Sequence, residues 1–314
     1  MTPDPQVQLI LEWIRNANAP EYSELTPQQA RTAFETAWAK LDARREDVFR
    51  AEDRRIPGPV EEIPVRIYTP AESASPLPVV VWLHGGGFVI GSLESYDAIC
   101  RVLANHSGAI VVSVDYRLAP EHPFPAAVDD AFAALKWAAA NASSYGGDAA
   151  RIAVAGDSAG GNLAAVCAIL ARDAGGPQLA RQVLIYPATA AHPDSASHLA
   201  YAEGYVLTRR TIQWFRHHKL GGRDPGDDFR HAPLLAPDLS GLAPALVIVA
   251  GFDPLHDEGV AYAKRLKDAG NTVDLLAFDG MVHGFLNFSR RVDAGRVAIG
   301  EVVKSLKKGF GLEP

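Results

Sequence analysis

A serine between two glycines follows one of the apolar runs of this 314-residue chain. Ile152 to Ala155 is typical of a buried strand, Gly156-Asp-Ser-Ala-Gly160 of a sharp turn, and Leu163 to Leu170 of a helix. This is the pattern G-x-S-x-G in a strand-turn-helix setting, where glycines are needed because side chains would collide with the neighbouring strand or helix. Ser158 is the predicted nucleophile, and the Ala159 N–H at the helix start is a predicted oxyanion donor. A glycine-rich turn with a serine helix cap is the alternative interpretation.

A glycine-rich segment, His84-Gly85-Gly86-Gly87-Phe88, follows another apolar run, Val79 to Leu83. Acyl transfer places negative charge on the former carbonyl oxygen, and backbone N–H groups of glycines can approach such an oxygen closely. Gly85 and Gly86 are the predicted donors. A phosphate-binding loop is the alternative, but the lysine of a Walker pattern is missing. His84 is predicted to shape the loop through hydrogen bonds and not to act as a base.

A serine hydroxyl needs a base to remove its proton and an acid to orient that base. In strand-turn-helix hydrolases the chain order is serine, then acid, then histidine. His283 follows the run Val273 to Phe278, and Asp253 follows the run Ala245 to Ala250, so both lie after strands in the required order. We predict His283 as the base and Asp253 as the acid. The competing carboxyl groups, expected in the next helix or too close to the base in sequence, are Asp257, Glu258 and Asp279.

The elements that must position these residues are short apolar, β-branched runs separated by helix-length segments. This alternation predicts an α/β fold with a mainly parallel sheet, covered by helices on both faces. Ligands bind beyond the carboxyl ends of the strands in such sheets, which is where the motifs stand. The predicted strands, the first of them antiparallel, are Ile63 to Tyr68, Leu77 to Leu83, Ala109 to Val114, Ile152 to Ala155, Val183 to Tyr186, Ala245 to Ala250 and Val273 to Phe278.

Two regions lie outside this alternation. At the N-terminus, Pro5 to Asn18 and a segment opened by the capping box Thr26-Pro-Gln-Gln29 predict amphipathic helices. Ala190 to Ala232 is rich in His, Asp, Ser and Gly, with one clear helix from Thr208 to Leu220. We interpret the two regions as one lid. The predicted division is a cap segment at 1–50, a cap insertion at 190–232, and a catalytic core at 51–189 and 233–314.

Composition limits the classes of function. A net charge of −7 and a pI near 5.8 disfavour nucleic-acid binding and favour a small-molecule substrate. Cys100 and Cys167 stand in apolar stretches, which predicts two buried free thiols. Met1 to Arg15 lack a secretory signal and no apolar run approaches roughly 20 residues, so we expect no membrane span and a cytoplasmic protein. No metal site is predicted, because no carboxylate or cysteine stands at ligand spacing from the candidate surface histidines His192, His198, His217 and His218.

Taken together, five motifs resemble those of the hormone-sensitive lipase family, the bacterial family IV esterases, in its G-D-S-A-G-G branch. They are His84-Gly-Gly-Gly87, Tyr116-Arg-Leu-Ala-Pro-Glu121, Gly156-Asp-Ser-Ala-Gly-Gly161, Asp253-Pro-Leu-His-Asp-Glu258 and His283-Gly-Phe285. The resemblance implies the α/β-hydrolase fold, with a mostly parallel sheet of about eight strands and a helical cap. It also implies a triad of Ser158, Asp253 and His283, oxyanion donors at Gly85, Gly86 and Ala159, and no cofactor.

The same resemblance implies a carboxylesterase acting on short- to medium-chain acyl esters, as a monomer or a homodimer. His256, where the family often has arginine, is a departure beside the predicted acid; we expect it solvated at a helix start. Arg117 and Glu121 are predicted to form a structural ion pair. The expected pocket walls are Phe88, Leu207, Phe215, Leu255 and Phe285. Two alternatives stay open: an amidase or deacetylase with the same triad, and a ligand-binding protein like the plant gibberellin receptors, which lack the catalytic histidine.

Overall fold

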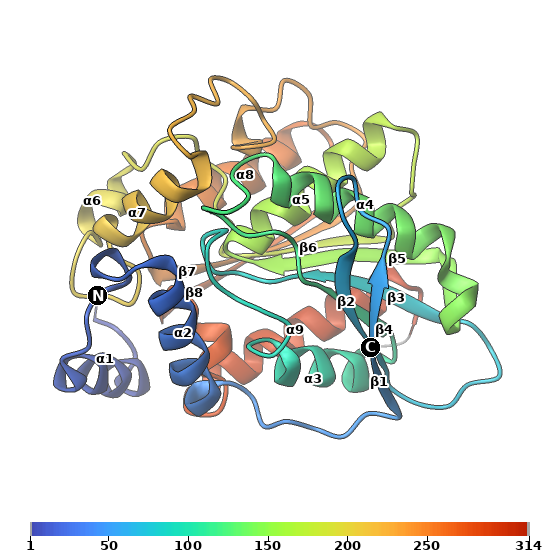
Figure 1. The fold of residues 1–314 in the computed structure, drawn as a ribbon, viewed down its shortest axis with the longest axis horizontal. Coiled ribbons are helices and arrows are strands. Elements are labelled where there is room, and N and C mark those ends of the chain that lie inside the picture. Colours follow the sequence, from blue (N-terminus) through green and yellow to red (C-terminus); the bar gives the residue numbers. More distant parts are fainter. Residues whose placement is uncertain (1, 313–314) are drawn as a thin grey trace.

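The computed structural model describes residues 2–312 and is built on an eight-stranded sheet of order β1-β2-β4-β3-β5-β6-β7-β8 (Figure 1). The strands from β3 to β8 are parallel, while β2 runs antiparallel to both β1 and β4. The α/β fold and the antiparallel start are therefore confirmed. The strands are β1 (Arg50–Ile56), β2 (Ile63–Thr69), β3 (Leu77–Leu83), β4 (Ile110–Val114), β5 (Gly147–Asp157), β6 (Arg181–Ile185), β7 (Ala245–Phe252) and β8 (Val273–Val282).

Strand β1 was not predicted. Its sequence, RAEDRRI, has one large apolar residue, Ile56 at its C-terminal end, which is also its only buried side chain. The strand lies at the edge of the sheet and pairs only with β2. An edge strand needs no second apolar face, and charged side chains there oppose pairing with another chain. The hydrophobic pattern that identifies the central strands is therefore missing from β1.

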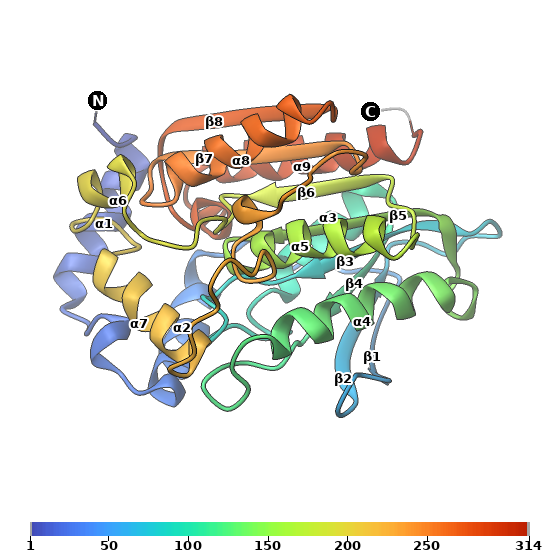
Figure 2. The same ribbon diagram turned by 90° about the horizontal axis from the view of Figure 1, so that it is seen from above.

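Helices cover both faces of the sheet (Figures 1 and 2). Helices α4, α5 and α8 lie on one face, and α3 and α9 lie on the other. The α-helices are α1 (Pro5–Ala17), α2 (Pro27–Leu41), α3 (Asp97–Ser107), α4 (Ala126–Ala140), α5 (Ala159–Asp173), α6 (Ala196–Ala200), α7 (Arg209–Leu220), α8 (His256–Asp268) and α9 (Asp293–Gly309). Short 3₁₀ helices are η1 (Tyr22–Glu24), η2 (Ala142–Tyr145), η3 (Pro233–Leu235) and η4 (Phe285–Phe288).

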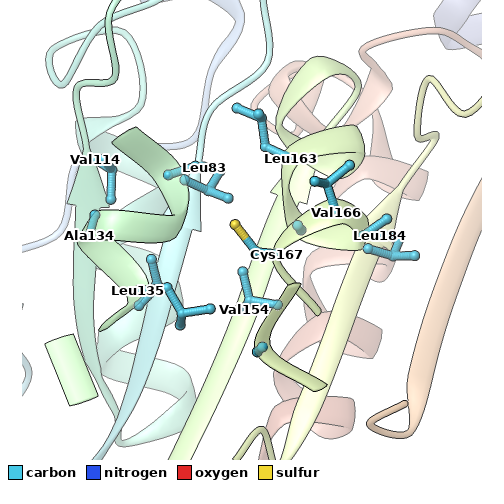
Figure 3. Close-up of a cluster of buried hydrophobic side chains, with 14 of the residues drawn as sticks. Leu83, Val114, Ala134, Leu135, Val154, Leu163, Val166, Cys167 and Leu184 are labelled. Atoms are coloured by element: carbon cyan, nitrogen blue, oxygen red, sulfur yellow. The ribbon is translucent and has the colours of Figure 1, made fainter. Parts of the chain in front are cut away.

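The core on the α4 and α5 side holds the strand that ends at Ser158. Figure 3 shows Val154 of β5 and Leu135 of α4 in one buried cluster with Cys167 of α5, and Leu184 of β6 beside Val166 of the same helix. Each of these side chains has no exposed surface. Full burial of such a side chain contributes about 1.5–3 kcal/mol, so the strand-turn-helix unit is held firmly on both sides. Cys167 here and Cys100 on the opposite face are buried free thiols, as predicted.

Helices α1, α2, α6 and α7 gather at one end of the sheet (Figures 1 and 2). The N-terminal segment contacts the insertion directly: Thr208 donates its hydroxyl to Glu21 over 3.0 Å, and the rings of Tyr22 and Phe215 lie 6.3 Å apart. The predicted capping box also forms, because Gln29 N–H donates to the Thr26 hydroxyl and Gln29 Oε1 accepts from Thr26 N–H. Helix α6 was not predicted. No helix among residues 2–312 has the length and apolar character that crossing a membrane requires.

Candidate active site

Ser158 stands at the junction of β5 and α5, with a backbone φ of 54° and ψ of −114°. Such a conformation is strained for a residue with a side chain and persists because the surroundings impose it, at a cost of about 1–3 kcal/mol. The glycines on either side make the turn possible. A Cβ at Gly160 would lie 1.9 Å from the carbonyl oxygen of Leu83, and one at Gly156 would lie 2.5 Å from the same oxygen. The predicted reason for both glycines is thus confirmed.

We expect Gly160→Ala to lower the free energy of unfolding by at least about 3 kcal/mol, because the clash is with backbone that cannot move aside. Gly300→Ala is the matched control. Gly300 lies on the exposed side of α9 with open space around its Cα, so alanine there should stabilise by about 0.5–1 kcal/mol. Urea unfolding of the three proteins measures both changes. Equal midpoints for Gly160→Ala and the wild type would contradict the argument.

His283 links Ser158 to Asp253. Its Nε2 lies 2.9 Å from Ser158 Oγ and its Nδ1 lies 2.7 Å from Asp253 Oδ2. Asp253 is fully buried, and its other oxygen accepts the Leu255 N–H over 2.8 Å. Since a carboxylate only accepts, the Asp253 contact places the proton on Nδ1 and leaves Nε2 free to accept from the serine hydroxyl. The side chains arrive from the ends of β5, β7 and β8, as the chain order requires.

The competing carboxyl groups have other partners or positions. Asp257 accepts the Ser197 N–H, and Glu258 accepts the N–H groups of Thr189 and Ala190. Both belong to helix α8, as expected. Asp279 lies exposed within β8. Among these carboxyl groups and Asp253, the structure brings only Asp253 to hydrogen-bond distance of His283.

The prediction of Gly85 as an oxyanion donor is wrong. Its N–H donates inward, to Asp157 Oδ1 at 2.8 Å and to the Tyr96 hydroxyl at 3.0 Å, and so it is not available to a substrate. Gly86 and Gly87 line the cavity instead, with φ values of 112° and 60°. Among the described residues, no hydrogen bond occupies the N–H of Gly86, Gly87 or Ala159.

His84 shapes this loop, as predicted. Its Nδ1 lies 2.7 Å from the Gly85 carbonyl oxygen, and its ring stacks on Tyr116 with 4.3 Å between centroids. The Tyr116 hydroxyl donates to the His84 carbonyl oxygen over 2.7 Å. Burial lowers the pKa of His84 to about 4, so the ring is neutral at physiological pH. A neutral ring that makes these contacts is part of the scaffold of the loop.

Arg31 of α2 ties the N-terminal helices to this loop. Its Nε donates to the Val89 carbonyl oxygen over 2.8 Å, and its Nη2 donates to the Ala119 carbonyl oxygen over 2.9 Å. The same guanidinium pairs with Glu121 at 2.6 Å. The predicted pair of Arg117 with Glu121 is therefore wrong: Arg117 pairs with Asp130 of α4 at 2.7 Å. The short distance in sequence favoured a pair between Arg117 and Glu121. In the fold, each of the two residues has a partner on a helix instead, Asp130 of α4 for Arg117 and Arg31 of α2 for Glu121.

Ser158 and His283 open into a cavity of about 160 Å³ roofed by α7 and η1. Four of the five predicted wall residues line it, namely Phe88, Leu207, Phe215 and Leu255. Phe285 does not, and that prediction is wrong: Gly284 turns the chain with φ 78°, and the Phe285 ring packs inside against Tyr186 and Phe278. Sequence reasoning missed further lining residues, among them Tyr22, Ile212, Arg216, Lys219 and His231.

One histidine predicted at the surface is buried. His198 of α6 is 1% exposed, and its Nε2 lies 3.4 Å from Glu258 Oε2. His256 does begin α8, but it is half-buried, with Nδ1 2.9 Å from the Ala250 carbonyl oxygen. Within residues 2–312, no group of three or more His, Cys, Asp or Glu side chains is arranged to hold a metal ion.

Comparison with known proteins gives concordant matches. A family model described as alpha/beta hydrolase fold matches residues 80–287. Carboxylic ester hydrolase LipN of Mycobacterium tuberculosis is 47% identical, over 81% of this chain and 69% of its own. Carboxylesterase NlhH of the same species is 48% identical over 79% of each chain. A hyperthermophilic esterase from Pyrobaculum calidifontis superposes with a TM-score of 0.93 at 43% identity, covering 98% of this chain and 99% of its own.

Proposed function

Because this chain belongs to the α/β-hydrolase fold family, we propose that Ser158, His283 and Asp253 form a triad that hydrolyses short- to medium-chain acyl esters. The chain is a carboxylesterase, like the relatives that it matches over most of its length. The observation that carries the assignment of residues is the continuous pair of hydrogen bonds, 2.9 Å and 2.7 Å, from serine through histidine to a buried aspartate.

In the proposed mechanism His283 Nε2 takes the proton of Ser158 as the serine oxygen attacks the ester carbonyl. The oxyanion that forms is held by the N–H groups of Gly86, Gly87 and Ala159, the last at the N-terminus of α5. His283 then gives its proton to the departing alcohol, which leaves an acyl group on Ser158. Water repeats the sequence with His283 as base, and Asp253 stabilises the imidazolium in both halves.

We further propose that the segments 1–50 and 190–232 act as one cap over a core of 51–189 and 233–314. The contacts of Thr208 with Glu21 and of Tyr22 with Phe215 support this division. The first residue of the cap and the last two of the core lie outside the described residues. Apolar side chains of the cap, among them Leu207, Ile212 and Phe215, line the cavity beside Ser158, which favours an apolar acyl group of limited length.

The test is a p-nitrophenyl ester series from acetate to palmitate, with matching p-nitroanilides. We expect kcat/KM to peak between butyrate and octanoate and to fall for longer chains, because the apolar wall beside Ser158 is of limited extent and polar side chains line the rest of the cavity. The anilides should react slowly. A maximum at palmitate would contradict the proposed chain length, and anilides hydrolysed faster than esters would favour an amidase.

A further inference from the structure

A lysine lies in the wall of the cavity that contains Ser158. Lys219, in the last turn of α7, is 6% exposed. Its Nζ sits 3.8 Å from the centroid of the Phe88 ring and donates one hydrogen bond, to the His231 carbonyl oxygen at 3.1 Å. An ammonium has three N–H donors, and the described residues accept a hydrogen bond from only one of them. A buried cation with unused donors is costly unless something else satisfies it.

The side chain of His231 adds a second unused donor at the same place. It also lines the cavity and is 4% exposed. Arg216 Nη1 donates to His231 Nε2 over 3.1 Å, which puts the ring proton on Nδ1. That Nδ1 is buried and has no hydrogen-bond partner among the described residues. Lys219, Arg216 and His231 therefore present donors, and two of them carry positive charge when protonated.

The position of this cluster relative to the nucleophile follows from Asn162. Asn162 lies one helical turn after Ser158, with its N–H donating to the Ser158 carbonyl oxygen over 3.0 Å. Its side-chain Nδ2 donates to the His231 carbonyl oxygen over 3.0 Å, and this is the oxygen that Lys219 also contacts. Asn162 therefore links the oxygen that the ammonium contacts to the catalytic turn, and Lys219 and Ser158 line the same cavity.

The charges around Lys219 favour an anion. Burial, followed by the charge of Arg216, lowers the pKa of Lys219 to about 7, and burial raises the pKa of Glu258 to about 8. At slightly acid pH the ammonium is charged and the Glu258 carboxyl is protonated, so these two groups together carry a positive charge. Burial also lowers the pKa of His231 to about 3 and keeps that ring neutral. The titratable groups that line a cavity together with Lys219 are Arg216, Glu258, His192, His198, His231, His283, Asp157, Tyr22, Tyr96 and His122.

We propose that Lys219 is a specificity determinant, whose ammonium binds a carboxylate carried by the ester substrate at a distance from the scissile bond. This inference rests on the proposed function, since it adds a substrate class to the same site. The carboxylate would complete the hydrogen bonding of Lys219 and accept from His231 Nδ1. A carboxylate in the acyl group and one in the alcohol share this chemistry, and the experiment separates them.

Two pairs of esters give the test. For the acyl side, the p-nitrophenyl monoester of adipic acid is compared with p-nitrophenyl hexanoate. For the alcohol side, the acetate ester of 4-hydroxybutyrate is compared with butyl acetate in a pH-stat. In each pair we measure the ratio of kcat/KM for the carboxylate ester to that for the uncharged ester. A pH dependence that belongs to the chemical step and is common to both esters cancels from the ratio.

In at least one pair, Lys219→Met should lower the ratio at about pH 6 by tenfold or more, which is the scale of a hydrogen bond to a charged group. Lys219→Arg should retain part of the wild-type preference for the carboxylate ester. The control Lys264→Met removes a lysine from the exposed face of α8 and should leave the ratio unchanged. In the wild type the ratio should fall from about pH 6 to about pH 9 as Lys219 loses its proton, and in Lys219→Met this fall should be absent.

Equal ratios for the wild type and Lys219→Met in both pairs would overturn the proposal, as would a wild-type ratio that does not fall with pH. The wild-type pH profile needs no variant, so the proposal stays testable if Lys219→Met does not fold. Failure of the proposed function would look different, since the uncharged esters would then react independently of Ser158.

Discussion

Ser158→Ala is expected to lower kcat on p-nitrophenyl butyrate by about 10⁶-fold, because no other described group can form the acyl-enzyme at that position. The fold should be retained, since alanine removes only a hydroxyl whose one hydrogen bond is to His283. Thermal unfolding checks this. Ser144→Ala is the matched control: Ser144 is exposed in η2, away from the cavity, and its loss should leave kcat within about twofold of wild type.

Labelling with a covalent reagent tests the same assignment of the nucleophile, and contaminating esterases do not affect the result. On reaction with the wild type, a p-nitrophenyl phosphonate should release one equivalent of p-nitrophenol and leave its phosphonyl group, with the corresponding gain in mass, on the peptide that contains Ser158. Ser158→Ala should take up none. Turnover of Ser158→Ala at the wild-type rate, or labelling of a different serine, would refute the assignment of the nucleophile.

Asp253→Asn should lower kcat by about 10⁴-fold with little change in the fold. The amide can present an N–H to His283 Nδ1, which would then accept, and the ring proton would move to Nε2. In that tautomer Nε2 cannot accept the proton of Ser158, and the imidazolium loses its counter-charge. The pH dependence of kcat/KM on p-nitrophenyl butyrate, recorded for both proteins, measures the effect.

Asp279→Asn tests the competing carboxyl group that lies nearest to His283 in the sequence. Asp279 lies four residues before His283 but is exposed in β8, so its substitution should leave kcat within about twofold of wild type. The assignment fails if Asp279→Asn is the more damaging of the two changes.

The sequence predicted what depends on local pattern. Val154 stands in a continuous apolar run, which predicted a buried strand, and the glycines around Ser158 predicted a turn too tight for side chains. Strand, turn and helix could therefore each be inferred from a few consecutive residues. Chain order then placed His283 and Asp253 at the ends of later strands. Strand β1 was not predicted because, as an edge strand, it carries charged residues in place of an apolar run.

What the sequence did not predict depends on partners far along the chain. Three consecutive glycines follow His84, and nothing in their order tells which N–H is free. The answer comes from Asp157, 72 residues away, whose carboxylate takes up the Gly85 N–H. Phe285 follows the catalytic histidine, yet the turn at Gly284 sends its ring into the core. Such outcomes are set by tertiary packing and leave no periodic signal.

The contacts of Arg31 bear on recombination between related esterases. The Arg31 side chain of α2 donates hydrogen bonds to the carbonyl oxygens of Val89 and Ala119, which belong to two segments of the catalytic core. A chimera that exchanges the N-terminal helices alone would separate this guanidinium from the backbone that fits it, even with every triad residue retained. Crossover points that keep residues 27–41, 86–92 and 117–121 from one parent avoid that loss. Helix α2 and the oxyanion loop should therefore be exchanged together.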